Sequence, residues 1–294
     1  MKRTAAHSLC FFVSDLHGHT VRYRKLFAAI EREGPAAVFL GGDLLPSHLI
    51  GLSSIEEAER DFLNDFLVPR FLRLKKKMGV SYPRIFIILG NDDLKAEEEP
   101  VIAASERGIW EYLHNRRKEL FGHSVFGYSY VPPTPFRLKD WERYDVSAYV
   151  DPGCIHPSEG AHSVPVPEGE IRYSTIAEDL KKLAPPEDDL AGAIFLFHSP
   201  PYETALDRAA LDGKSIDYVP LDPHVGSIAI KRFIENRQPL LTLHGHVHES
   251  SAITGSWKDR IGRTHALSAA HGGPELALVR FRPERPEEST RELL

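Results

Sequence analysis

The chain has 294 residues, of which 42% are hydrophobic and 27% charged, and its formal net charge is −6. This length can bury a substantial core, and the acidic balance argues against a surface that binds duplex nucleic acid through its phosphates. No apolar run approaches the roughly 20 residues of a membrane span. The two cysteines form no disulfide framework, so we expect a reducing, cytoplasmic environment.

The first part of the chain alternates strands and helices. An apolar run at residues 9–13 predicts a strand that stops at Asp15 and His17, and a second run is followed by Gly41-Gly42-Asp43. Between them, the apolar positions 23, 26, 27 and 30 predict an amphipathic helix that ends at Gly34. Near the start of this helix, Arg22 is a candidate for binding a substrate phosphate, although a solvated arginine is the commoner case.

A long excursion, residues 44–83, precedes the third strand, and we interpret it as an insertion. Ser54 and Glu57 form a capping-box pattern for a helix that Pro69 should kink or divide. His48 is a candidate for facing the site, although a lone loop histidine is more often incidental. The third strand, residues 85–89, is followed by Gly90-Asn91-Asp92-Asp93.

The next segments are predicted in turn as a charged helix at residues 96–121, a strand at 124–131 and a second insertion at 132–192. The loops at 139–167, with Trp141, Tyr149 and His156, are expected to line the substrate pocket, because long connections in compact domains are often functional.

The last part of the chain brings two more strands that end on histidine. One is followed by His198-Ser199-Pro200-Pro201 and the other by His244-Gly245-His246-Val247-His248. The remaining predicted elements are helices at 176–183 and 227–237 and strands at 264–269 and 275–281. We predict a single domain over residues 1–282 and a charged, disordered tail at 283–294.

Five apolar runs thus stop on Asp, Asn or His, at the strand ends where ligands gather in open α/β sheets. These side chains suit Mn, Fe, Zn or Ni. Two divalent ions about 3.5–4 Å apart need one shared carboxylate, and the chain supplies enough ligands. Alternation of strands and helices early, followed by consecutive strands, predicts an α/β sandwich with two sheets.

In this order, the motifs resemble those of the calcineurin-like metallophosphoesterase superfamily, D-x-H, G-D, G-N-[HX]-[DE], H and G-H-x-H. The matching residues are Asp15/His17, Gly42/Asp43, Gly90/Asn91, His198 and Gly245/His246/His248. The resemblance covers most of the chain. It implies a four-layer α/β/β/α sandwich, in which two packed mixed β-sheets are flanked by helices.

The resemblance also implies a pair of divalent cations. Asp15, His17, Asp43 and His248 would hold the first, and Asp43, Asn91, His198 and His246 the second. Such a centre implies a hydrolase in which a metal-bridging hydroxide attacks a phosphate ester. We expect a small phosphodiester, phosphomonoester or nucleotide as substrate, with Asn91 also contacting it.

The chain departs from the family pattern after Asn91, where many members have a histidine that acts on the leaving group. Here the residue is Asp92, and an aspartate of ordinary acidity is a poor proton donor at neutral pH. Three alternatives stay open: Asp92 has altered acidity, another group such as His271 donates the proton or binds the substrate, or the substrate has a good leaving group. A non-catalytic scaffold of the same fold that lacks the leaving-group histidine is the alternative function.

Overall fold

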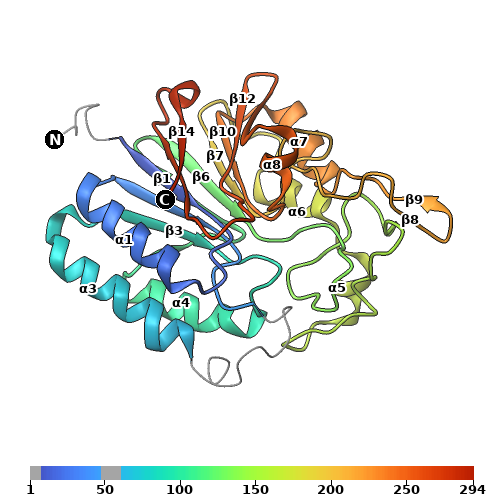
Figure 1. The fold of residues 1–294 in the computed structure, drawn as a ribbon, viewed down its shortest axis with the longest axis horizontal. Coiled ribbons are helices and arrows are strands. Elements are labelled where there is room, and N and C mark those ends of the chain that lie inside the picture. The colour runs from blue at the N-terminus through green and yellow to red at the C-terminus, as the bar shows by residue number, and fades with distance from the viewer. Residues whose placement is uncertain (1–7, 48–60) are drawn as a thin grey trace.

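A computed structural model describes residues 8–47 and 61–294. Within these ranges two six-stranded sheets form the centre of the molecule (Figure 1). The first sheet has the order β14 (Thr290–Leu293), β13 (Ala277–Phe281), β1 (Cys10–Val13), β2 (Ala37–Gly41), β3 (Arg84–Ile88), β4 (Glu111–Tyr112). The second has the order β11 (Lys258–Ile261), β12 (Thr264–Ser268), β10 (Leu241–His244), β7 (Ile194–Phe197), β6 (His123–Tyr128), β5 (Arg116–Leu120).

Both sheets are mixed. In the first, β1 to β4 run parallel, and β13 is antiparallel to both β1 and β14. In the second, β12, β10, β7 and β6 are parallel, and the edge strands β11 and β5 are antiparallel to their neighbours. Because neighbouring strands run parallel, the carboxyl ends of β1, β2 and β3 lie side by side at one end of the first sheet. Those of β7 and β10 lie side by side at one end of the second sheet.

Successive side chains of a strand point to opposite faces of its sheet. The strands therefore contribute to two separate apolar layers, one between the sheets and one under the helices. Phe12, Phe39 and Phe86 are buried between the sheets, together with Leu196 and Leu243 from the second sheet. The rings of Phe39 and Phe86 stack with their centroids 5.0 Å apart. Each such buried phenylalanine contributes about 1.5–3 kcal/mol relative to an exposed one.

The next residues along the strands point the other way, toward the helices. Phe11, Val38 and Ile85 belong to a core that includes Leu26 and Ile30. Figure 1 shows α1 and α3 along the outer side of the first sheet and α6 and α7 beside the second. The helices are α1 (Thr20–Glu33), α3 (Val68–Met78), α4 (Glu98–Glu106), α5 (Glu168–Tyr173), α6 (Ile176–Leu183), α7 (Ile228–Arg237) and α8 (Ser250–Thr254). Two packed mixed sheets flanked by helices confirm the predicted fold class.

Smaller elements complete the description. A π-helical segment at Phe62–Leu67 leads directly into α3, and Pro69 is in the first turn of α3, so the helical form changes from π to α next to this proline. The capping-box residues Ser54 and Glu57 and the candidate His48 lie outside the described residues. The short hairpin β8 (Ser215–Ile216) and β9 (Val219–Pro220) projects from the right of Figure 1. Turns of 3₁₀ helix lie at Gly79–Ser81, Lys95–Glu97 and Pro286–Glu288.

Three segments differ from their predicted structure. Residues 111–112 and 116–120, both within the predicted helix at 96–121, form the short strand β4 and the edge strand β5, and the first four side chains of β5 are exposed. The predicted disordered tail at 283–294 instead forms a 3₁₀ turn and β14, which pairs antiparallel with β13. At least one of the tail charges supports this pairing, because Oε2 of Glu292 lies 2.9 Å from Nη2 of Arg280 in β13.

The loops at 139–167 are largely irregular, as predicted, but Trp141 does not line an open pocket. Its side chain is fully buried and packs against His114 and Tyr130, with ring centroids 5.0 and 5.4 Å away. Trp141 is therefore part of the core. Among the described residues, no helix is both long enough and apolar enough to cross a bilayer.

Candidate metal centre

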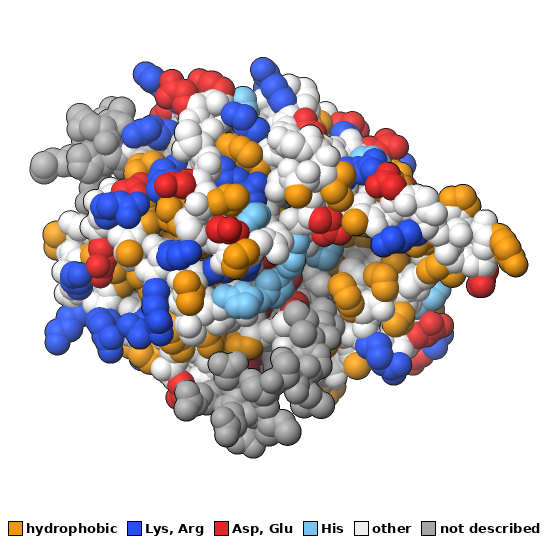
Figure 2. All heavy atoms as spheres, in the orientation of Figure 1, with side chains coloured by type: hydrophobic (Ala, Val, Ile, Leu, Met, Phe, Trp, Pro, Cys, Tyr) orange, Lys and Arg blue, Asp and Glu red, His pale blue; other side chains and the backbone are white. Residues whose placement is uncertain are grey.

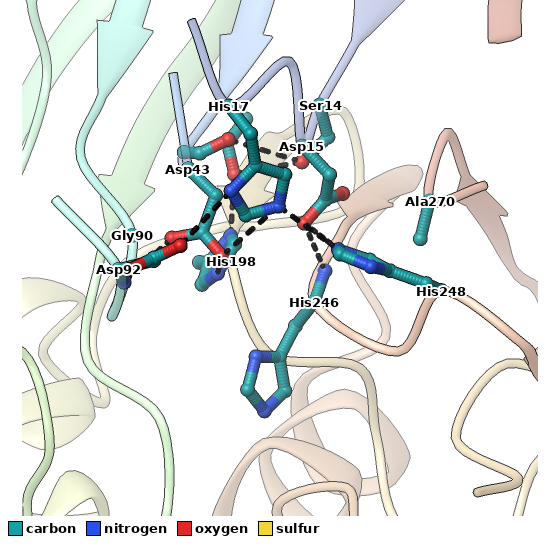
Figure 3. A network of polar contacts seen from close by, with 12 residues as sticks. Ser14, Asp15, His17, Asp43, Gly90, Asp92, His198, His246, His248 and Ala270 are labelled. Atoms are coloured by element: carbon teal, nitrogen blue, oxygen red, sulfur yellow. Dashed lines mark hydrogen bonds and ion pairs between the residues drawn. The ribbon is translucent and has the colours of Figure 1, made fainter. Parts of the chain in front are cut away.

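Polar side chains from both sheets meet at the carboxyl ends of the strands. They lie in the loops that follow β1, β2, β3, β7 and β10. Figure 3 shows that Asp15, His17, Asp43, Asp92, His198 and His248 gather at one place, with the His246 ring below them. The loop after β1 carries Asp15 and His17, that after β2 Asp43, that after β3 Asn91 and Asp92, that after β7 His198, and that after β10 His246 and His248. Residues far apart in the sequence are thus neighbours at this edge.

Four of these residues form what we call the first ligand group: Asp15, His17, Asp43 and His248. One ligand atom from each lies within 4.8 Å of all the others. The Nε2 atom of His248 is 3.3 Å from Oδ1 of Asp15 and 3.2 Å from Nε2 of His17. The same nitrogen of His17 is 3.9 Å from Oδ2 of Asp43.

The second ligand group is formed by Asp43, His198 and His246, whose ligand atoms also lie within 4.8 Å of one another. The Nε2 atom of His198 is 3.3 Å from Oδ2 of Asp43. It is also 3.1 Å from Oδ1 of Asn91, which places the predicted amide ligand at the same point. Asp43 belongs to both groups.

The donors in these groups fit divalent cations. Carboxylate oxygens and imidazole nitrogens are the ligands that Mn, Fe, Zn and Ni accept. The Oδ2 atom of Asp15 is buried and makes no hydrogen bond, and a buried carboxylate oxygen is normally paired. Two ring nitrogens, of His17 and His248, also face each other at 3.2 Å. A cation would satisfy all three atoms.

Four ligand residues have an unusual backbone. Asp15, His17, Asp43 and His246 have φ values of 58°, 45°, 51° and 74°, in the left-handed region that residues other than glycine rarely adopt. Such conformations cost about 1–3 kcal/mol each and cluster at functional sites. Backbone hydrogen bonds hold them here, since the N–H of Asp15 donates to Gly42 O and that of His17 to Asp43 O.

Two motif glycines leave room for the ligands. A Cβ atom on Gly90 would lie 2.3 Å from Oδ1 of Asp43 and 2.6 Å from Nε2 of His198. On Gly245 it would lie 2.7 Å from Oδ2 of Asp15. Any larger residue at either position would displace a ligand atom, which explains why these motifs contain glycine.

The charges of the ligands are set by burial and by one another. Burial opposes the negative charge of Asp43, but His198 and His17 outweigh it and hold the pKa of the Asp43 carboxyl well below its usual range. Burial likewise opposes charging of His198, yet Asp43 raises its pKa to about 9. Burial, assisted by His198, lowers the pKa of His246 to about 3. The His246 ring is therefore neutral at pH 7 and ready to bind a metal, whereas His198 would release a proton when a metal binds.

Outer contacts fix the orientation of the ligands. The Nδ1 atom of His198 is 2.8 Å from the carbonyl of Gly41, which directs Nε2 toward Asp43. The guanidinium of Arg22 donates from Nη1 to Asp15 O at 2.7 Å and from Nη2 to Gly273 O. The Arg22 side chain thus connects the first strand loop to the loop after β12.

The candidate proton donors lie at the border of the site. The Nε2 atom of His271 is 2.9 Å from Oε2 of Glu275. Next to it in sequence, Gly272 is close to His248, because a Cβ on Gly272 would be 3.8 Å from that of His248. Oδ2 of Asp92 is 3.1 Å from Nδ1 of His17.

The sequence motifs did not reveal the role of Asp93. This residue is fully buried, and its carboxylate accepts hydrogen bonds from the backbone N–H groups of Leu44, Leu45 and Gly90. It thereby joins the loops after β2 and β3, which carry Asp43 and Asn91. Its only sequence signal was its place as the last acid of the Gly90-Asn91-Asp92-Asp93 motif.

The centre is reachable from solvent. Histidine side chains gather near the middle of the face drawn in Figure 2, and the side chains of His17 and His248 are 14% and 35% exposed. The site therefore opens on this face rather than being sealed in the core.

A sequence profile described as calcineurin-like phosphoesterase matches residues 10–250, a range that contains all seven predicted ligands. The chain belongs to the calcineurin-like phosphoesterase family. No curated protein matches the chain. The family assignment confirms the resemblance found in the sequence motifs.

Two solved structures share the fold of this chain over nearly its whole length. One crystal structure superposes with a TM-score of 0.61 at 14% identity and covers 97% of this chain and 98% of its own. Protein TT1561 of Thermus thermophilus gives 0.55 at 14% identity, with 98% and 99% coverage. A dimetal phosphatase from Danio rerio gives 0.45 at 10% identity, with 97% and 95% coverage. At such identities the similarity concerns the fold alone.

Proposed function

We propose that this protein is a dinuclear-metal hydrolase that cleaves a phosphate ester in a small molecule. Family membership supports this proposal, and one observation carries it: Asp43 belongs to both candidate ligand groups. A shared carboxylate is what two ions about 3.5–4 Å apart need.

The proposed ligands divide between two ions. Asp15, His17, Asp43 and His248 would hold one, and Asp43, Asn91, His198 and His246 the other. When bound, such ions neutralise charge on phosphoryl oxygens and bring the pKa of coordinated water toward about 7. We propose that the metal is Mn, Fe, Zn or Ni, because the donors are carboxylate, amide and imidazole groups.

We assign the surrounding residues different roles. His271 is proposed to donate a proton to the leaving group, since Gly272 beside it is close to His248. Arg22 is proposed as a structural link rather than as a phosphate contact, because its guanidinium donates to two backbone carbonyls.

The substrate is proposed to be a phosphodiester, a phosphomonoester or a nucleotide. The net charge of −6 disfavours duplex nucleic acid. A cytoplasmic location is proposed because Cys10 and Cys154 are both free thiols, which suits a reducing compartment.

The test is metal-dependent turnover. Protein stripped by a chelator is reloaded with Mn, Fe(II), Zn or Ni and assayed on an aryl phosphodiester and an aryl phosphomonoester, beside elemental analysis. We expect turnover with at least one metal. Replacing the shared ligand, D43N, should reduce turnover by more than the roughly 10–100-fold that outer-sphere partners typically contribute.

A matched control is D145A. The carboxylate of Asp145 is also largely buried, but it accepts hydrogen bonds from Ser227, Ile228 and Ala229 at the start of α7, so its loss should affect stability and not metal content. Wild-type protein that binds no divalent ion and hydrolyses neither ester with any metal would contradict the proposal and favour the scaffold alternative.

A further inference from the structure

Asp92 contacts the candidate metal ligand His17 through the ring nitrogen that does not face His248. Its Oδ2 atom is 3.1 Å from Nδ1 of His17, while Nε2 of the same ring faces His248 at 3.2 Å. Figure 3 shows the His17 ring between Asp92 on one side and Asp15 and His248 on the other. Asp92 is only 4% exposed, so water screens this pairing weakly.

The two nitrogens of an imidazole divide their roles. When one faces a carboxylate, its proton stays on that side and the other nitrogen keeps a lone pair for a metal. The approach of Asp92 to His17 is an ion-pair contact rather than an aligned hydrogen bond. It still favours the state in which Nε2 of His17 is the ligand atom.

The same residue supports a second ligand. The backbone N–H of Asp92 donates to Oδ1 of Asp43 at 2.8 Å. With Oδ1 held in this way, Oδ2 of Asp43 lies toward His17 and His198, 3.9 and 3.3 Å away. Asp92 therefore contacts two of the four members of the first ligand group, one through its side chain and one through its backbone.

We propose that Asp92 is a positioning residue, which orients His17 and Asp43 for the first metal ion, and that it is not the acid that protonates the leaving group. This inference rests on the proposed metal centre. It chooses among the alternatives left open by the sequence, because a carboxylate that faces a ligand ring from behind has the geometry of an outer-sphere partner.

The test compares D92A and D92N with wild type. Both keep the backbone N–H that binds Asp43, so the variants change the side chain that contacts His17 and leave that hydrogen bond in place. Calorimetric titration of metal-free protein with Mn²⁺ and with Zn²⁺ should resolve two sites. D92A should weaken one of them by about 10–100-fold, the usual effect of removing an outer-sphere partner, and leave the other unchanged.

D92N keeps an oxygen or amide group near Nδ1 but has no charge, so its affinity should lie between those of D92A and wild type. The control D145A should bind both ions like wild type. Equal affinity of D92A and wild type at both sites would overturn the inference.

Turnover at saturating metal gives a second readout. A positioning role predicts that D92A slows an aryl and an alkyl phosphodiester by the same factor, because the leaving group is not involved. Selective loss of the alkyl ester, which depends more on protonation, would instead make Asp92 the acid and overturn the inference. Wild-type protein that binds no metal would overturn the proposed function itself and the inference with it.

Discussion

At the scale of single residues, the candidate metal centre depends on glycines, which have no side chain, as much as on the candidate ligands. The ligands of two sheets reach a common point only because Gly90 and Gly245 have no Cβ atom in their way. Such crowding cannot be read from a local pattern, since the atoms in conflict belong to other loops. The sequence motifs nevertheless contain both glycines, so substituting either glycine tests the described geometry directly.

We expect G90A to lose metal affinity. The new methyl group would lie 2.3 Å from Oδ1 of Asp43 and 2.6 Å from Nε2 of His198, so both ligands must move. Metal titration should show a loss of at least about tenfold, or 1.4 kcal/mol.

The control is G34A at the end of α1. Gly34 has a φ of 57° with open space around it, so alanine there costs stability through backbone strain without contacting a ligand. G90A protein that binds metal like G34A would show that the two loops are farther apart than described.

The candidate ligands could be singled out from the sequence, whereas the residues that contact them could not. Each ligand follows an apolar run, so local pattern alone singled out Asp15, Asp43 and His198. The contact between Asp92 and His17 joins the loops after two different strands. Its geometry depends on the rotamers of both side chains, which the hydrophobic periodicity of the sequence does not predict.

At the scale of elements, four strands of the two large sheets were not predicted from the sequence, and β4, β5, β11 and β14 all lie at sheet edges. Central strands such as β1 and β2 are buried on both faces and read as continuous apolar runs. β5 and β14 are exposed edge strands rich in charge, which is how proteins protect edges from aggregation. Their composition therefore resembles a helix or a disordered tail.

Removing residues 289–294 should destabilise the protein by about 1–3 kcal/mol, the usual range for a disruptive change. β14 pairs with β13 from Ala277 to Arg280, and the Nζ atom of Lys25 donates to Leu294 O at 2.8 Å. Urea unfolding should show a lower midpoint. Metal affinity should be unchanged, because β1 keeps both of its neighbours. An unchanged midpoint would mean that the tail contributes nothing to the sheet.

At the scale of the whole molecule, stability should depend on pH through buried histidines. The side chain of His114 is buried among aromatic rings, and its Nδ1 accepts a hydrogen bond of 3.0 Å from the N–H of Ser129. Burial first, and then the charges of Lys95 and Arg143, lower the pKa of His114 well below its usual value. The ring therefore stays neutral in the folded protein.

The sign of the effect follows from proton binding. Below about pH 6.5 the unfolded chain takes up a proton on this histidine that the folded chain does not bind. The free energy of unfolding should therefore fall as pH decreases from 6.5, by up to about 1.4 kcal/mol per pH unit for one proton. In urea unfolding of metal-free protein between pH 5 and 8, H114Q should be less stable at neutral pH, because it loses aromatic packing, yet lose less stability on acidification. Equal slopes for H114Q and wild type would show that another group controls acid unfolding.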